Sequence, residues 1–171
     1  MFLTKLKNMK KLFVSVILLF SLQYSFSQVS YYKGEWTAVN KQNRFTGVFK
    51  IGMNAGGKVK AQFIWTYLRI DSTNKDLVEM YKGKKDRSGI EYAEGYFSAS
   101  TNDFNLEGKR KVDPFTILGL DKYHIKLSVD KQAIYGTTET QGTNEGMLYA
   151  VKLSNAAGKK IFIAAKAKVK N

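Results

Sequence analysis

The residue types most often used for catalysis are scarce in this chain, which has one histidine and no cysteine. His124 falls on the polar face of an alternating segment, which predicts a solvent-facing ring, with a catalytic base as the alternative. Zinc and copper sites need several histidine or cysteine ligands, so we expect no metal. A Ser-His-Asp triad could use Asp121 or Asp113, but no G-x-S-x-G motif is present. Without a phosphate-binding loop or dinucleotide fingerprint, we expect no cofactor.

Carboxylates are the second kind of residue that could act chemically. A pair of them could hydrolyse a glycosidic bond, with one as the acid and the other as base or nucleophile. The alternative is that they are exposed residues that balance surface charge. The candidates on or beside predicted strands are Glu91, Glu94, Glu107 and Glu145.

Aromatic side chains form the clearest candidate ligand surface. Phe63, Trp65 and Tyr67 share one face of the segment 58–70, which alternates strictly at its start. Such a face is either plain core or, in a barrel, the lining of a ligand cavity. The predicted ligand-binding residues are Trp36, Phe63, Trp65, Tyr67, Tyr96 and Tyr123, and Tyr135 and Tyr149 could join that face.

The first 27 residues have the layout of a secretory signal peptide: a basic head, an apolar run at 12–22 and small residues before the junction. The apolar run is shorter than the roughly 20 residues of a membrane-spanning helix, although a retained anchor remains the alternative. We predict cleavage between Ser27 and Gln28. The mature protein, residues 28–171, is then periplasmic or secreted and has no transmembrane segment.

The predicted mature chain is strongly basic. Four of the 28 lysines and arginines lie in the leader, so 24 oppose 14 acidic residues and the net charge is +10. This charge favours an anionic glycan, a lipid headgroup or an acidic protein as partner, unless it serves solubility alone. Nucleic acid fits poorly with export and with the absence of a nucleic-acid-binding motif. The basic residues that cluster in predicted turns are Lys82, Lys84, Lys85, Arg87, Lys109, Arg110 and Lys111.

The elements that must position these residues are β-strands. Short alternating segments follow one another at close spacing with polar or glycine-containing turns between them, and helical periodicity is almost absent after the leader. This pattern predicts one all-β antiparallel domain, a meander closed into a barrel, with a sandwich as the alternative. Glycines inside strands favour sharp bends or close packing, as in barrels. The predicted strands are 34–40, 45–53, 58–70, 77–81, 90–99, 104–108, 123–129, 133–138, 146–153 and 160–169.

The triplet Gly34-Glu35-Trp36 resembles the G-x-W signature of the lipocalin and avidin-like (calycin) barrels, in which the tryptophan closes one barrel end. This resemblance implies a calycin-type barrel. More broadly, YKGKKDRSGIEYAEGYF and DPFTILGLDKYHIKLS resemble segments of small exported β-proteins of Bacteroidota, which implies no particular activity.

These observations predict an exported, non-catalytic binding or interaction protein of the cell envelope. It would bind a small apolar or sugar ligand inside the barrel, or an anionic surface through its basic loops. A glycan-acting hydrolase that uses a carboxylate pair is the alternative.

Overall fold

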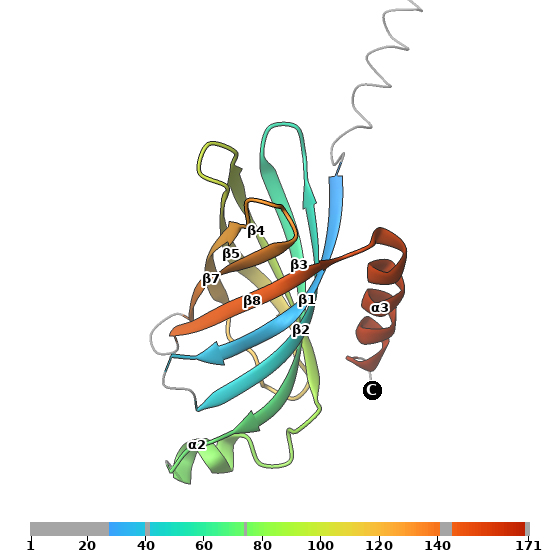
Figure 1. The fold of residues 1–171 in the computed structure, drawn as a ribbon. Coiled ribbons are helices and arrows are strands. Elements are labelled where there is room, and N and C mark those ends of the chain that lie inside the picture. Colours follow the sequence, from blue (N-terminus) through green and yellow to red (C-terminus); the bar gives the residue numbers. More distant parts are fainter. Residues whose placement is uncertain (1–27, 40–41, 74, 141–144, 170–171) are drawn as a thin grey trace, which may run out of the picture.

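The strands of this protein, along which buried and exposed side chains alternate, form one sheet that closes on itself (Figure 1). The computed structural model describes residues 28–39, 42–73, 75–140 and 145–169, so the predicted signal peptide lies outside it. Eight antiparallel strands form a closed barrel in meander order, which confirms the barrel and not the sandwich. The strands are β1 (Gln28–Ala38), β2 (Asn43–Met53), β3 (Lys58–Ile70), β4 (Ser88–Ser98), β5 (Asp103–Val112), β6 (Asp121–Leu127), β7 (Ala133–Thr140) and β8 (Glu145–Leu153).

Two of the ten predicted strands are helices. The segment predicted at 77–81 belongs to the short helix α2 (Lys75–Met80), which lies at one end of the barrel. The segment predicted at 160–169 belongs to α3 (Asn155–Lys168), whose first turn is capped by the side chain of Ser154. Alanine and lysine favour helix here, and the region of helix-forming residues is much longer than the apolar alternation that suggested a strand.

Aromatic rings fill the middle of the barrel. Phe49, Phe63 and Tyr123 are fully buried, and the Phe63 and Tyr123 rings stack with centroids 4.3 Å apart. Trp65 lies 4.7 Å from Phe49, measured between ring centroids. We call these four residues the aromatic plug. The barrel therefore has a packed centre, with a cavity towards each of its two ends.

A second, smaller core lies outside the sheet, where α3 packs across β1, β2 and β3. Phe162 of α3 contacts Tyr31, with ring centroids 6.0 Å apart, and covers Ile64 and Ile90 on the outer face. The helix thus buries Ile64 on the outer face of β3, while Phe63 and Trp65 are buried on its inner face. Neither helix in the part of the chain described here is long and apolar enough to span a bilayer.

Candidate ligand-binding site

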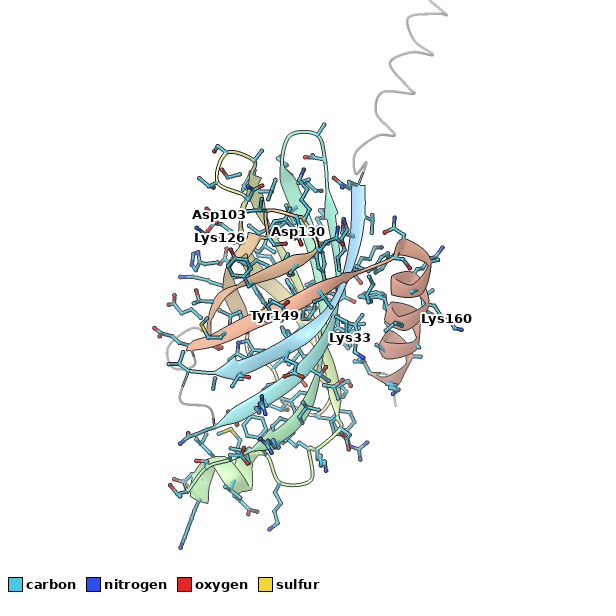
Figure 2. The ribbon with its side chains drawn as sticks, in the orientation of Figure 1. Lys33, Asp103, Lys126, Asp130, Tyr149 and Lys160 are labelled. Carbon is cyan, nitrogen blue, oxygen red and sulfur yellow. The ribbon has the colours of Figure 1, made fainter. Side chains whose placement is uncertain are left out.

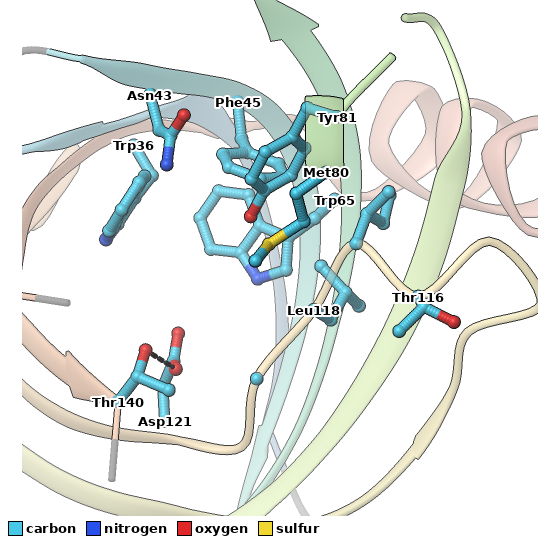
Figure 3. Close-up of a pocket in the computed structure, with 12 residues that line it drawn as sticks. Trp36, Asn43, Phe45, Trp65, Met80, Tyr81, Thr116, Leu118, Asp121 and Thr140 are labelled. Carbon is cyan, nitrogen blue, oxygen red and sulfur yellow. Dashed lines mark hydrogen bonds between the residues drawn. The ribbon is translucent and has the colours of Figure 1, made fainter. Parts of the chain in front are cut away.

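A pocket of about 250 Å³ opens at the end of the barrel that carries α2 (Figure 3). Its walls come from the end of β1, the start of β2, the far half of β3 and the β5–β6 loop. α2 and the residue after it cover one side. The antiparallel meander brings these segments together, because alternate connections meet at the same end of the barrel.

Four aromatic residues line the pocket: Trp36, Phe45, Trp65 and Tyr81. Trp36 and Phe45 meet edge to face, with ring centroids 5.5 Å apart. Tyr81 stacks on Tyr67 at 4.7 Å and directs its hydroxyl group towards the pocket in Figure 3. Burial raises the pKa of Tyr81, so this hydroxyl stays protonated at neutral pH. The walls are therefore mainly apolar surface with a few polar groups, as in most small-molecule sites.

Asp121 brings a carboxylate to the pocket from the start of β6. The hydroxyl of Thr140, its register partner on β7, donates a 2.6 Å hydrogen bond to Oδ1 (Figure 3). Burial raises the pKa of Asp121, while Thr140 and the charge of Lys111 oppose the rise. Asn43 adds an amide from the start of β2; it is 5% exposed, and its Oδ1 has no hydrogen-bond partner among the described residues.

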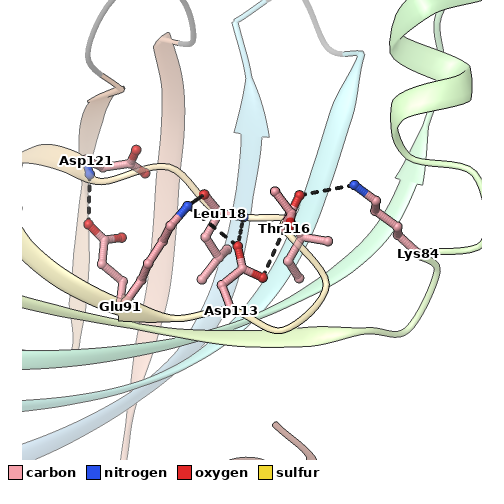
Figure 4. Close-up of polar contacts among 8 residues, drawn as sticks. Lys84, Glu91, Asp113, Thr116, Leu118 and Asp121 are labelled. Carbon is pink, nitrogen blue, oxygen red and sulfur yellow. Dashed lines mark hydrogen bonds and ion pairs between the residues drawn. The ribbon is translucent and has the colours of Figure 1, made fainter.

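The β5–β6 loop is held against the pocket by Asp113, whose side chain is 1% exposed (Figure 4). Its carboxylate accepts hydrogen bonds from the backbone N–H groups of Ile117, at 3.0 Å, and Leu118, at 2.7 Å. Two lysines fasten the loop from outside: Lys84 donates to the Thr116 carbonyl at 3.1 Å, and Lys111 donates to the Leu118 carbonyl. The loop wall is thus fixed by polar contacts.

Behind Asp121, one carboxyl group is enclosed in the barrel interior (Figure 4). Glu91 accepts a 2.8 Å hydrogen bond from the backbone N–H of Asp121 and another from the Tyr123 hydroxyl. Burial, followed by the nearby charge of Asp121, raises the pKa of Glu91 to about 8. A Cβ on Gly108 would lie 2.0 Å from its Oε1 atom, so glycine there leaves the space that Glu91 occupies.

The predicted ligand-binding residues separate into two groups inside the barrel. Trp36 lines the pocket, and so does Trp65, which also belongs to the aromatic plug. Phe63 and Tyr123 belong to the aromatic plug, and Tyr67 lies buried behind Tyr81. These last three residues support the pocket from behind and do not line it.

Three predicted interior tyrosines point outwards, contrary to expectation. Tyr96, on β4, is 61% exposed on the outer surface of the sheet. Tyr135 and Tyr149 face each other across β7 and β8 on the outer face, and Figure 2 shows Tyr149 on the solvent side. The reason is strand parity: in β4 the inward set is Glu91, Ala93 and Gly95, so Tyr96 must point away.

The basic residues do not form a set of free loop side chains. Lys109, Arg110 and Lys111 lie in strand β5, not in the predicted turn. Six of the seven contact neighbouring groups: Lys82 pairs with Glu79, Lys84 with the Thr116 carbonyl, Arg87 with the Phe115 ring, Lys109 with Glu107, Arg110 with the Tyr92 ring, and Lys111 with Asp113. Their contacts fasten loops and strands, which weakens the case for an anion-binding rim.

His124 is exposed on the outer face, as predicted, and its Nδ1 lies 2.9 Å from Oδ1 of Asn105. Of the four candidate glutamates only Glu91 points into the barrel; Glu94, Glu107 and Glu145 are exposed. Within the described ranges, no group of three or more histidine, cysteine, aspartate or glutamate residues could hold a metal ion.

Sequence reasoning missed several pocket residues, namely Asn43, Phe45, Met80, Tyr81, Thr140 and the loop residues from Thr116 to Gly119. Phe45 carried a usable signal, because it begins the alternating apolar set of 45–53. Asn43 and Thr140 carried none, since polar residues at strand ends are normally solvated.

A smaller cavity of about 200 Å³ lies at the opposite end of the barrel. Tyr32, Phe97, Phe104 and Leu127 line it, and Lys131 and Lys152 stand at its edge. The aromatic plug separates it from the α2-end pocket.

No protein-family model matches this chain, and neither a curated protein nor a solved structure matches it. The likeness to lipocalins and avidins therefore rests on the Gly34-Glu35-Trp36 triplet and the barrel alone.

Proposed function

We propose that this chain is an exported binding protein that holds a small, largely apolar ligand in the pocket at the α2 end. The observation that carries the proposal is the pocket itself, in which aromatic walls surround a few polar groups. Its volume of about 250 Å³ lies just below the usual range of about 300–1,000 Å³, so the ligand has about the size of one ring with a short chain.

The tryptophans make this proposal directly testable. The chain has two, Trp36 and Trp65, and both line the pocket. A ligand that enters should change the intrinsic fluorescence, and the variants Trp36→Phe and Trp65→Phe assign the change to one wall. A library of small aromatic, aliphatic and sugar molecules can be screened in this way on the mature protein.

A matched pair of variants distinguishes the two ends of the barrel. Leu118→Phe narrows the α2-end pocket, and Leu127→Phe makes the same change in the opposite cavity. We expect Leu118→Phe to weaken the binding of any fluorescence hit at least tenfold and Leu127→Phe to leave it unchanged. The proposal would be contradicted if the two variants weakened binding equally, or if no molecule in the library changed the tryptophan fluorescence.

A hydrolase is the competing function, because Glu91 has the raised pKa of a general acid and lies beside Asp121. However, Glu91 is 1% exposed and does not line the pocket, so a substrate there would not touch it. If Glu91→Gln abolished a turnover detected on a glycan panel, the binding proposal would have to be replaced.

Export is part of the proposal and has its own test. Mass spectrometry of the protein from its native host should find a chain that begins at Gln28, in the periplasm or the medium. A full-length chain in the membrane fraction would contradict it.

A further inference from the structure

We propose that the α2-end pocket selects a small organic cation, such as an aromatic amine, with Asp121 as the counter-charge. This rests on the proposed function, since it names the class of ligand for the same pocket. The first observation is the sign of the charge. Asp121 is the one acidic residue among the described residues that line the pocket, and these include no lysine or arginine, although the chain as a whole is strongly basic.

Lys111 lies near enough to favour the ionised form of Asp121, but the ammonium groups of the nearby lysines are held outside the pocket. The ammonium groups of Lys84 and Lys111 bind the backbone carbonyls of Thr116 and Leu118, as Figure 4 shows for the loop wall. Lys111 also lies 3.7 Å from Asp113, which offsets part of its charge. Neither lysine lines the pocket. Asp121 is therefore the charged side chain that a cation meets among the described residues lining the pocket.

The hydrogen-bonding groups of the pocket also suit a donor ligand. Thr140 occupies Oδ1 of Asp121, and Figure 3 shows the second carboxylate oxygen directed into the space between the two tryptophans. Asn43, on the same wall, has an Oδ1 atom without a partner among the described residues, and Figure 3 shows its amide nitrogen turned towards the pocket, so this oxygen faces the space only after a turn of the amide. A buried acceptor without a partner is destabilising, so a ligand N–H group that reached this oxygen would relieve that cost.

The indole N–H groups of the two tryptophans point to partners within the protein. They are therefore not directed at a ligand, which disfavours an anionic one. Trp36 Nε1 donates to Thr138 at 2.6 Å, and Trp65 Nε1 points to the Tyr123 hydroxyl at 3.5 Å. Both N–H groups therefore face other parts of the barrel interior, while their rings remain as walls. Aromatic rings around a cation are favourable because the ring quadrupole attracts positive charge.

A charge series with one skeleton tests the inference on the unmodified mature protein. The probes are phenethylamine, 2-phenylethanol and phenylacetate, which share a ring and a short chain and differ in charge. Isothermal titration at pH 7 should give the amine at least tenfold higher affinity than the alcohol, and phenylacetate the lowest. An alcohol or acid that binds as tightly as the amine overturns the inference.

Asp121→Asn tests the assigned group, because it removes the charge and keeps an oxygen that can accept from Thr140. The affinity for the amine should fall at least tenfold, to that of the alcohol, while the affinity for the alcohol stays within about twofold. The control is Asp103→Asn, which removes a carboxylate that pairs with Lys126 at 3.8 Å on the outer face (Figure 2) and should change neither.

The outcomes separate this inference from the proposed function. If a neutral library molecule binds, is blocked by Leu118→Phe and is preferred over amines, the inference fails and the binding proposal stands. If an amine is preferred equally by Asp121→Asn and the unmodified protein, the assignment of Asp121 fails. If no molecule changes the tryptophan fluorescence, both are overturned.

Discussion

The Tyr123 hydroxyl donates a hydrogen bond to Oε2 of Glu91 in the interior of the barrel, where neither side chain reaches solvent. Interior carboxyls are costly when ionised, because the charged form loses its hydration. Glu91 meets this cost by retaining its proton, with a pKa of about 8. Folding therefore keeps a proton on Glu91 at pH values where the unfolded chain has lost it.

The first prediction concerns stability against pH. In the unfolded chain Glu91 ionises near its ordinary pKa of 4.5, whereas the folded protein holds the proton to about pH 8. The unfolded state thus binds fewer protons in this window, so the free energy of unfolding falls as pH rises, by ~1.4 kcal/mol for each unit of pKa difference.

Glu91→Gln isolates this effect, because the variant has no proton to lose and keeps an oxygen for the Asp121 N–H. Denaturant unfolding at pH 5, 7 and 8.5 should show the unmodified protein losing stability relative to the variant as pH rises. Asp121 titrates in both proteins, so its contribution largely cancels in the difference. If the free energy of unfolding changed with pH in the same way in both proteins, Glu91 would be ionised in the folded protein throughout this range.

The second prediction concerns the wall behind Trp36. A Cβ added to Gly146 would lie 2.0 Å from Cε2 of the Trp36 indole, so Gly146→Ala must displace that ring. Overpacking of this kind costs about 1–3 kcal/mol, and the shifted indole should alter the fluorescence spectrum. Gly56→Ala is the control, because its Cβ would meet nothing nearer than 3.6 Å. Equal unfolding midpoints for the two variants would contradict the packing.

The third prediction concerns the aromatic plug. Phe63 is fully buried and stacks on Tyr123, so Phe63→Ala should cost roughly 3–5 kcal/mol of stability in chemical denaturation. Tyr96→Ala removes an aromatic ring from the exposed outer face and should stay within about 0.5 kcal/mol. A small effect at Phe63 would mean that this face of β3 is not the core.

The fourth prediction concerns the loop wall. Asp113→Ala removes the acceptor for the backbone N–H groups of Ile117 and Leu118 and should cost about 1–3 kcal/mol. It should also weaken ligand binding and speed proteolysis within residues 113–120. Asp130→Ala is a matched control, because Asp130 accepts from the Gln132 N–H in an exposed turn outside the pocket. Its binding affinity should equal that of the unmodified protein.

Strand β4 shows why the sequence predicted the barrel but not which side chains point into it. Alternation marks the strand, yet ranking its residues by apolarity selects Ile90, Tyr92 and Tyr96 as the inner set. The inner set instead begins with Glu91 and continues with small residues, because rings from β3 fill the space opposite them. Ile90 is buried by α3 on the outside, a contact between segments distant in sequence that local alternation does not reveal.

The pocket residues also differ in whether the sequence alone could predict them. Trp36 and Trp65 were predicted, Trp36 through the triplet Gly34-Glu35-Trp36 and Trp65 through the apolar face it shares with Phe63 and Tyr67. Asn43, Thr140 and the β5–β6 loop join the pocket only through strand register and through the capping contacts of Asp113. Those contacts depend on closure of the sheet, which no local pattern records.

The aromatic plug also has a kinetic consequence. A molecule in the α2-end pocket cannot continue through the barrel, so it leaves by the mouth through which it entered. Its residence time is then set by the contacts with the pocket walls that it must break as it leaves in that direction. A linker attached to the solvent-facing end of a ligand, beside the exposed Met80, would be tolerated, whereas one added methyl group at the buried end would meet the rings of the plug.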